Sequence, residues 1–104
     1  VTIEIDSGAI PLLDGALELA TAGMLTSGDK SNREYVGDAV GFAESVDKNL
    51  IRLMFDPQTA GGMLISIAES EAEALLARLR DNYPNARIIG RVHPQGPLSI
   101  IVSA

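Results

Sequence analysis

A glycine-rich bend is the first segment whose residue types suit chemistry. It lies between two apolar stretches and reads Asp56-Pro57-Gln58-Thr59-Ala60-Gly61-Gly62. Pro57 stiffens the turn and Thr59 offers a hydroxyl, while the Gly61-Gly62 pair lets backbone N–H groups approach a ligand closely. Such a bend could hold an anionic oxygen. An alternative stays open, in which Asp56 caps a helix or turn and the glycines serve only tight packing.

A second polar segment, residues 23–32, comes close to a phosphate-binding P-loop. Gly23 and Gly28 are separated by four residues, and Lys30-Ser31 follow. The motif fails because Asp29 stands before Lys30, and because the preceding element is predicted to be a helix, whereas a P-loop follows a strand. An acidic side chain would also repel phosphate. We exclude a P-loop and predict a loop from Met24 to Asn32, of a length typical of functional loops.

The other reactive side chains form no catalytic set. His93 is the only histidine and lies beside a proline, which indicates a surface turn residue rather than a general base. The chain has no Cys, so thiol nucleophiles, disulfides and thiolate zinc sites are excluded. Glu69, Glu71 and Glu73 are predicted to oppose the dipole at the start of a helix. We predict no catalytic residue and no metal site in this chain.

The elements that position these segments follow from the spacing of apolar residues. Alternation predicts a strand over residues 1–5, with its apolar side chains on one face. Helical spacing predicts a helix over 10–22, with Pro11 in its first turn and Gly23 in the left-handed conformation after its end.

Two further elements flank the bend. A short helix is predicted over 47–55, buried on its Leu50, Leu53 and Met54 side. After the bend, the apolar run 63–67 predicts a buried strand.

The second half of the chain predicts one helix and two strands. Ser70 and Glu73 match a capping box, and the helix that follows has an apolar stripe of Ala72, Leu75, Leu76 and Leu79. It is expected to end near Tyr83-Pro84. Strands are predicted over 87–92 and 98–102, and the Pro and Gly residues between them favour a tight reversal.

This order of elements predicts an α/β or α+β domain, a layered mixed β-sheet with packed helices. A chain of 104 residues has room for a single domain. About four strands are few for a complete three-layer domain. With the missing initiator Met, this leads us to expect a piece of a longer protein, truncated at its N-terminal side.

Composition excludes several classes of partner. A net charge of −6, with 8 basic against 14 acidic residues, argues against nucleic-acid binding, which needs clustered Lys and Arg. The sequence has no apolar run long enough to cross a membrane and no secretory signal at Val1. The absence of Cys is compatible with a cytoplasmic protein.

Two motifs resemble one enzyme family. The run Leu53-Met-Phe-Asp-Pro-Gln-Thr-Ala-Gly-Gly-Met-Leu-Ile65 closely resembles the Asp-Pro-Gln-Thr-Ser-Gly-Gly signature of selenophosphate synthetases (selenide, water dikinases), differing at Ala60. Upstream, Thr26-Ser-Gly-Asp-Lys-Ser-Asn32 is similar to the family's Pro-Gly-Gly-Thr-x-x-Asn motif. It keeps Gly28 and Asn32 and departs at Thr26, Ser27 and Asp29. The resemblance extends over essentially the whole chain.

The resemblance implies a fold and a reaction. The family belongs to the aminoimidazole ribonucleotide synthetase superfamily, whose members pair an N-terminal ATP-binding domain with a C-terminal α/β domain. Residues 1–104 would be most of that second domain. The family reaction makes selenophosphate, AMP and phosphate from selenide, ATP and water, with magnesium. Its reactive Cys or selenocysteine, its Lys and its magnesium-binding aspartates are placed in the N-terminal half.

For this chain the resemblance implies a supporting role. ATP and Mg²⁺ are expected as cofactors of the full-length enzyme and not as tight ligands of this piece. Its expected partners are the N-terminal ATP-binding domain and selenide, in a full-length cytoplasmic homodimer. A non-catalytic interaction module and a sister enzyme of the superfamily remain as alternatives. The candidate substrate or phosphate-loop residues are Asp56, Gln58, Thr59, Gly61, Gly62, Gly28 and Asn32.

Overall fold

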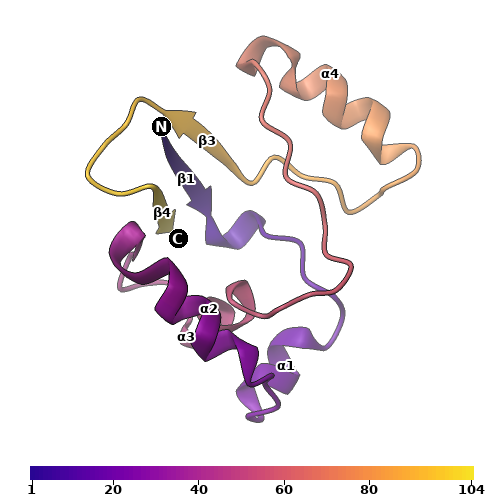
Figure 1. Ribbon diagram of the computed structural model, residues 1–104. Coiled ribbons are helices and arrows are strands. Elements are labelled where there is room, and N and C mark those ends of the chain that lie inside the picture. Colours follow the sequence, from indigo (N-terminus) through magenta and orange to yellow (C-terminus); the bar gives the residue numbers. More distant parts are fainter.

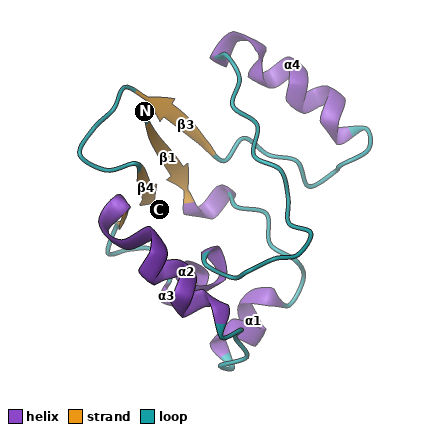
Figure 2. Ribbon diagram, viewed as in Figure 1, coloured by secondary structure: helices purple, strands orange, loops and turns teal.

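The computed structural model describes residues 1–104 and contains one mixed four-stranded sheet (Figures 1 and 2). Its strands are β1 (Thr2–Asp6), β2 (Val40–Phe42), β3 (Gly90–His93) and β4 (Ile100–Ser103), in the order β2-β4-β1-β3. The central strands β1 and β4 are parallel, β2 is parallel to β4, and β3 is antiparallel to β1. The predicted fold class, a mixed sheet with packed helices, is confirmed.

The helices are α1 (Ala16–Thr21), α2 (Gly28–Val36), α3 (Lys48–Met54) and α4 (Glu69–Arg80). Two short 3-10 turns, Ser7–Ala9 and Gly37–Ala39, complete the elements. In Figure 1, α1, α2 and α3 gather at one end of the molecule, while α4 stands apart at the other. No helix is both long and apolar enough to span a membrane.

The core lies between the sheet and α3. Ile5 of β1 pairs with Val102 of β4, so both side chains point to the same face. They are buried together with Val46. Ile51 and Met54 of α3 pack against this cluster, so α3 covers the apolar face of the sheet.

The predicted helix over 47–55 is confirmed as α3. Asp47 caps it, because one carboxylate oxygen accepts hydrogen bonds from the N–H groups of Asn49 and Leu50, at 2.8 and 3.0 Å. The side chain of Asn49 also donates to the Thr21 hydroxyl in α1, at 3.2 Å. The helix that leads into the bend is therefore fixed at its start and joined to α1.

Two predictions before α3 hold only in part, because helix α1 lies within the predicted range but is shorter, and the predicted loop is shorter as well. The helix predicted over 10–22 begins only at Ala16, and Pro11 lies outside it. The left-handed backbone of Gly15, with φ of 81°, turns the chain into the helix at that point. Gly23 has φ of 83° after the helix end, as predicted. The loop predicted over 24–32 is helical from Gly28 onward.

The strand predicted over 63–67 is wrong. These residues are extended, belong to no strand and are all exposed. A strand needs a neighbour for its backbone N–H and C=O groups. The sheet ends at β2 and β3, and neither is paired with this segment.

The terminal strands form, but they are not neighbours. β1 lies between β3 and β4, so the expected tight reversal is a wider connection across the start of β1. The Thr2 hydroxyl donates to the Leu98 carbonyl at 2.6 Å and accepts from the Gly96 N–H at 2.8 Å. The connection between β3 and β4 therefore covers Thr2, and its hydroxyl has both a donor and an acceptor partner, which explains why a polar residue is buried there.

The predicted capping box of α4 is wrong, although its apolar stripe is confirmed. The helix starts at Glu69, so Ser70 lies inside it and the cap position is Ala68, which has no side-chain cap. Glu69 and Glu71 lie in the first turn as predicted, whereas Glu73 comes later. The residues of α4 that are at least partly buried are Ala72, Leu75, Leu76 and Leu79.

Candidate functional site

The two motif segments lie against each other. The side-chain amide of Asn32 in α2 donates to the backbone carbonyl of Phe55 at 2.8 Å. The Thr26 hydroxyl, just before α2, donates to a carboxylate oxygen of Asp56 at 2.7 Å. Asn32 and Asp56, both singled out from the sequence, thus belong to one contact region between the start of α2 and the start of the bend.

Gly28 allows this close approach. A Cβ placed on Gly28 would lie 2.5 Å from Cγ of Pro57, which is shorter than carbon atoms tolerate. The φ of Gly28 is not positive, so glycine is needed here for space and not for backbone conformation. The predicted site residue Gly28 therefore packs on the bend itself.

Ionic and aromatic contacts reinforce the same region. A carboxylate oxygen of Asp29 lies 3.7 Å from Nε of Arg52 in α3. The guanidinium of Arg33 lies 5.1 Å above the ring of Phe55. Phe55 is buried and meets Phe42 of β2 edge to face, with 6.0 Å between ring centroids. The start of the bend is thereby anchored to the sheet.

The remaining candidates lie beyond this anchor. Gln58, Thr59, Gly61 and Gly62 are exposed, and the Thr59 hydroxyl makes no hydrogen bond within the chain. A Cβ on Gly61 would lie 2.9 Å from the side-chain oxygen of Gln58, whereas one on Gly62 would meet nothing within 4 Å. Neither glycine has a positive φ. This half of the bend is free to meet another molecule or domain.

The chain offers no metal site of its own. No group of three or more His, Cys, Asp or Glu side chains is close enough to hold an ion. Asp56 is the only carboxylate in the bend, and one of its oxygens already accepts from Thr26. These residues do not fit a magnesium ion by themselves, so we assign no step through one to this chain.

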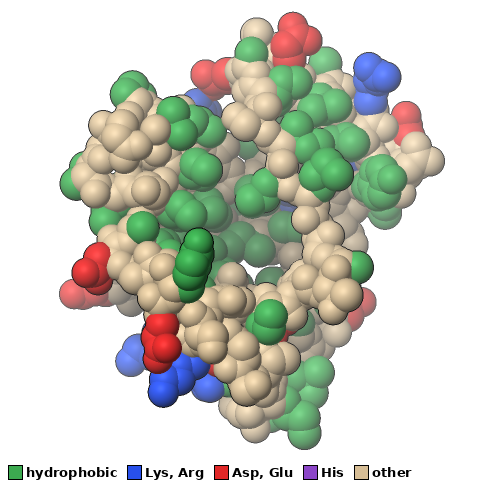
Figure 3. Space-filling model, in the orientation of Figure 1, with side chains coloured by type: hydrophobic (Ala, Val, Ile, Leu, Met, Phe, Trp, Pro, Cys, Tyr) green, Lys and Arg blue, Asp and Glu red, His purple; other side chains and the backbone are tan.

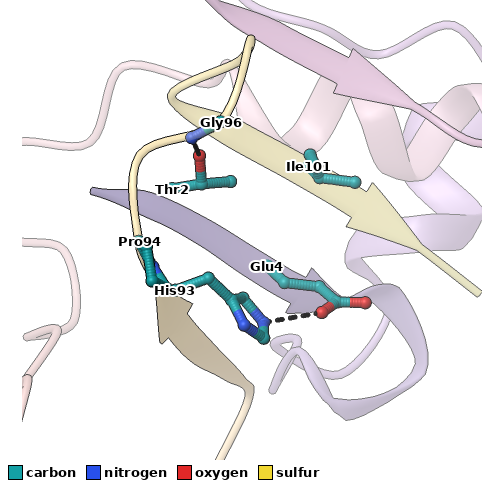
Figure 4. Close-up of a pocket in the computed structure, with 6 residues that line it drawn as sticks. All are labelled: Thr2, Glu4, His93, Pro94, Gly96 and Ile101. Carbon is teal, nitrogen blue, oxygen red and sulfur yellow. Dashed lines mark hydrogen bonds and ion pairs between the residues drawn. The ribbon is translucent and has the colours of Figure 1, made fainter.

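Sequence reasoning missed a shallow hollow on the polar face of the sheet, of about 310 Å³. At its floor, Nε2 of His93 lies 2.9 Å from a carboxylate oxygen of Glu4 (Figure 4). The two residues are 89 positions apart, so no local pattern could indicate the pair. The structure places His93 at the end of β3 and not in a turn. The lining residues, none of them a predicted site residue, are Thr2, Glu4, His93, Pro94, Gly96 and Ile101.

Comparison with known proteins gives a consistent result. A selenide, water dikinase of Clostridium botulinum (strain Eklund 17B / Type B) is 39% identical over 101 residues, covering 97% of this chain and 29% of the relative. That of Caldanaerobacter subterraneus is 44% identical over 103 residues, covering 98% and 30%. That of Clostridioides difficile is 38% identical, with the same coverage. No family model matches the chain.

The chain belongs to the selenide, water dikinase family. It spans about 30% of the length of the curated relatives that it matches and corresponds to a C-terminal fragment of them. The family resemblance found in the two motifs is therefore confirmed.

Proposed function

We propose that this chain is the C-terminal domain of a selenide, water dikinase that makes selenophosphate from selenide, ATP and water. Its role is to help close the active site, and it is inactive alone. The observation that carries this proposal is the direct contact between the two family motifs, through Asn32 and the Phe55 carbonyl and through Gly28 and Pro57. Residues far apart in sequence are thus held as one surface.

Within that surface the outer half of the bend is the part that meets the reactants. Phe55 and Pro57 fix its start, which presents the Thr59 hydroxyl and the backbone N–H groups of Gly61 and Gly62 to the outside. Donors held in place by a fixed backbone stabilise developing negative charge on phosphate or selenium species without reorganisation. Asp56 and Asn32 orient the bend from behind.

The partners in this proposal lie outside the chain. An N-terminal domain would bind ATP with Mg²⁺ and carry the reactive residues, and selenide would be the second substrate. The assembled enzyme would be a cytoplasmic homodimer. The relatives are selenide, water dikinases, which supports the reaction class, and their greater length supports a further domain.

The test is a double substitution, Thr59→Ala with Gly61→Ala, in the full-length protein. We expect turnover of ATP in the presence of selenide to fall at least about tenfold, because a hydroxyl donor is lost and the bend is reshaped. The urea midpoint should stay close to that of the wild type, since both residues are exposed.

Ser45→Ala is the matched control, because it removes an exposed hydroxyl outside the bend. Its turnover should equal that of the wild type. If the double variant also keeps full turnover, the bend has no part in the reaction.

A further inference from the structure

Asp56, the first residue of the bend, is held differently through its main chain and its side chain. Its backbone N–H donates to the Leu53 carbonyl at 3.0 Å, and its neighbours Phe55 and Pro57 are held against α2. Its carboxylate takes part in one hydrogen bond, the 2.7 Å bond from the Thr26 hydroxyl. The main chain is therefore fixed without Thr26, whereas the direction of the carboxylate depends on it.

An aspartate commonly turns its carboxylate towards the chain that follows. Its side chain then accepts a hydrogen bond from the backbone N–H two residues further on. Asp6 and Asp47 both do so in this chain, at 2.9 and 2.8 Å. Asp56 does not, and the N–H of Gln58, two residues after it, has no acceptor within the chain. The usual partner of the carboxylate is thus left free.

Thr26 accounts for this exception. Helix α2 begins at Gly28, its cap residue is Ser27, and no side chain caps it, so the Thr26 hydroxyl does not serve the helix. It donates instead to Asp56, 30 positions away. The family motif has proline at this position, and a proline side chain has no hydroxyl to donate. The bond is therefore a feature that Thr26 brings to this chain.

The orientation of α2 holds Thr26 in this place. Gly28 and Asn32, four residues apart, lie on one side of the helix, and both contact the 55–57 region. Lys30 and Glu34 lie on the other side, where their exposed side chains pair at 3.9 Å. Figure 3 shows acidic and basic side chains together at the end of the molecule where α2 lies. The segment before α2 is therefore kept beside the bend.

We propose that Thr26 is a positioning residue, which holds the Asp56 carboxylate against the segment before α2 and away from the Gln58 N–H. This free N–H adds a donor to those of Gly61 and Gly62 in the exposed part of the bend. A carboxylate turned inwards would occupy the donor and repel an anionic phosphate or selenium species. The effect on turnover rests on the proposed function, whereas the direction of the carboxylate depends on no reaction.

Hydrogen exchange of the full-length protein, resolved to single amides, tests the direction of the carboxylate. In Thr26→Val the carboxylate loses its partner and should turn to the Gln58 N–H, which should then exchange at least about threefold more slowly than in the wild type. Thr26→Ser keeps the hydroxyl and should leave the wild-type rate. An unchanged Gln58 rate in Thr26→Val, or the same slowing in Thr26→Ser, overturns the inference.

Turnover of ATP in the presence of selenide tests the consequence. Thr26→Val should lower it about fivefold and Thr26→Ser should keep it within about twofold, on the scale of one lost hydrogen bond. When Asp56→Ala is already present, Thr26→Val should change turnover by less than about twofold, because no carboxylate is left to turn inwards. A loss of the full size in that background would mean that Thr26 does not act through Asp56, which overturns the inference.

The two measurements separate this inference from the proposed function. Slower Gln58 exchange in Thr26→Val together with unchanged turnover would uphold the direction of the carboxylate and overturn the part of the bend in the reaction. Lower turnover without slower exchange would overturn the inference and leave the proposed function standing.

Discussion

Gly28 and Pro57 make the tightest contact between the two motif segments. The bend belongs to no helix or strand, so its position depends on the residues that pack against it, and this contact is one of them. Three further contacts surround it, from Thr26, Asp29 and Asn32. Two of these residues, Thr26 and Asp29, are among the three positions where the sequence departs from the family motif, and the third is Ser27. In this chain Thr26 bonds to Asp56 of the bend, whereas Asp29 pairs with Arg52 in the helix that precedes the bend.

Gly28→Ala is expected to destabilise the chain by about 1–3 kcal/mol, because the added methyl group has no room beside Pro57. The measurement is the midpoint of urea unfolding, converted with the slope of the transition. Gly62→Ala is the matched control, since its methyl group meets nothing, and its effect should stay within about 0.5 kcal/mol. Equal effects at the two glycines would contradict the packing argument.

The sequence identified the bend, Gly28 and Asn32, but not how they meet. Glycine and proline spacing marks a tight turn, so residues 56–62 stood out by themselves. The bond from Thr26 to Asp56 joins residues 30 positions apart, and the guanidinium of Arg33 lies over the ring of Phe55, which is also distant in the sequence. Contacts of this kind depend on the complete fold and leave no local pattern.

Helix α3 shows which elements can be found from sequence. Its apolar side and its capping Asp47 are local features, and both are present in the structure. Helix α2 was missed because all its residues are polar or only weakly apolar until Tyr35 and none is buried. Contacts with the 52–57 region stabilise α2, and propensity alone does not reveal them. For residues 63–67 the sequence predicted a strand that the structure does not contain. An apolar pattern does not show whether another strand lies beside the segment to pair with it.

Asp47→Ala is expected to cost about 1 kcal/mol, within the range of about 0.5–2 kcal/mol for a lost helix cap. The side chain satisfies the N–H groups of Asn49 and Leu50, which would otherwise have no partner. Thermal or urea unfolding of the variant measures the loss.

Glu44→Ala removes a nearby exposed carboxylate that has no such bond, and it should be close to neutral. A loss of the same size in this control would point to net charge, and not to capping, as the cause.

The whole molecule is more open than its length requires. Its accessible surface is 7779 Å², against about 5,600 Å² for a compact protein of this mass. Its radius of gyration is 14.5 Å, against about 13 Å for a compact domain of this length. Only 9 of 104 residues are buried, and the core between the sheet and α3 is small. Each residue in that core therefore carries an unusually large share of the stability.

Val102→Ala should accordingly destabilise the chain by about 2 kcal/mol, because Val102 is 0% exposed and its loss leaves a cavity. Val1→Ala, at a position 70% exposed, should change the free energy of unfolding by less than about 0.5 kcal/mol. Both values come from urea unfolding under the same conditions. A small loss at Val102 would mean that the core relaxes around the missing methyl groups.

Because a side chain at position 28 would clash with Pro57, substitutions at these two positions depend on each other. The atoms in the way belong to the ring of Pro57, so the tolerance of one position is set by the identity of the other. In a mutational library, variants with alanine at position 28 should recover fitness chiefly through second changes that remove the proline ring. The two motifs would then be inherited as a linked pair rather than drift apart independently.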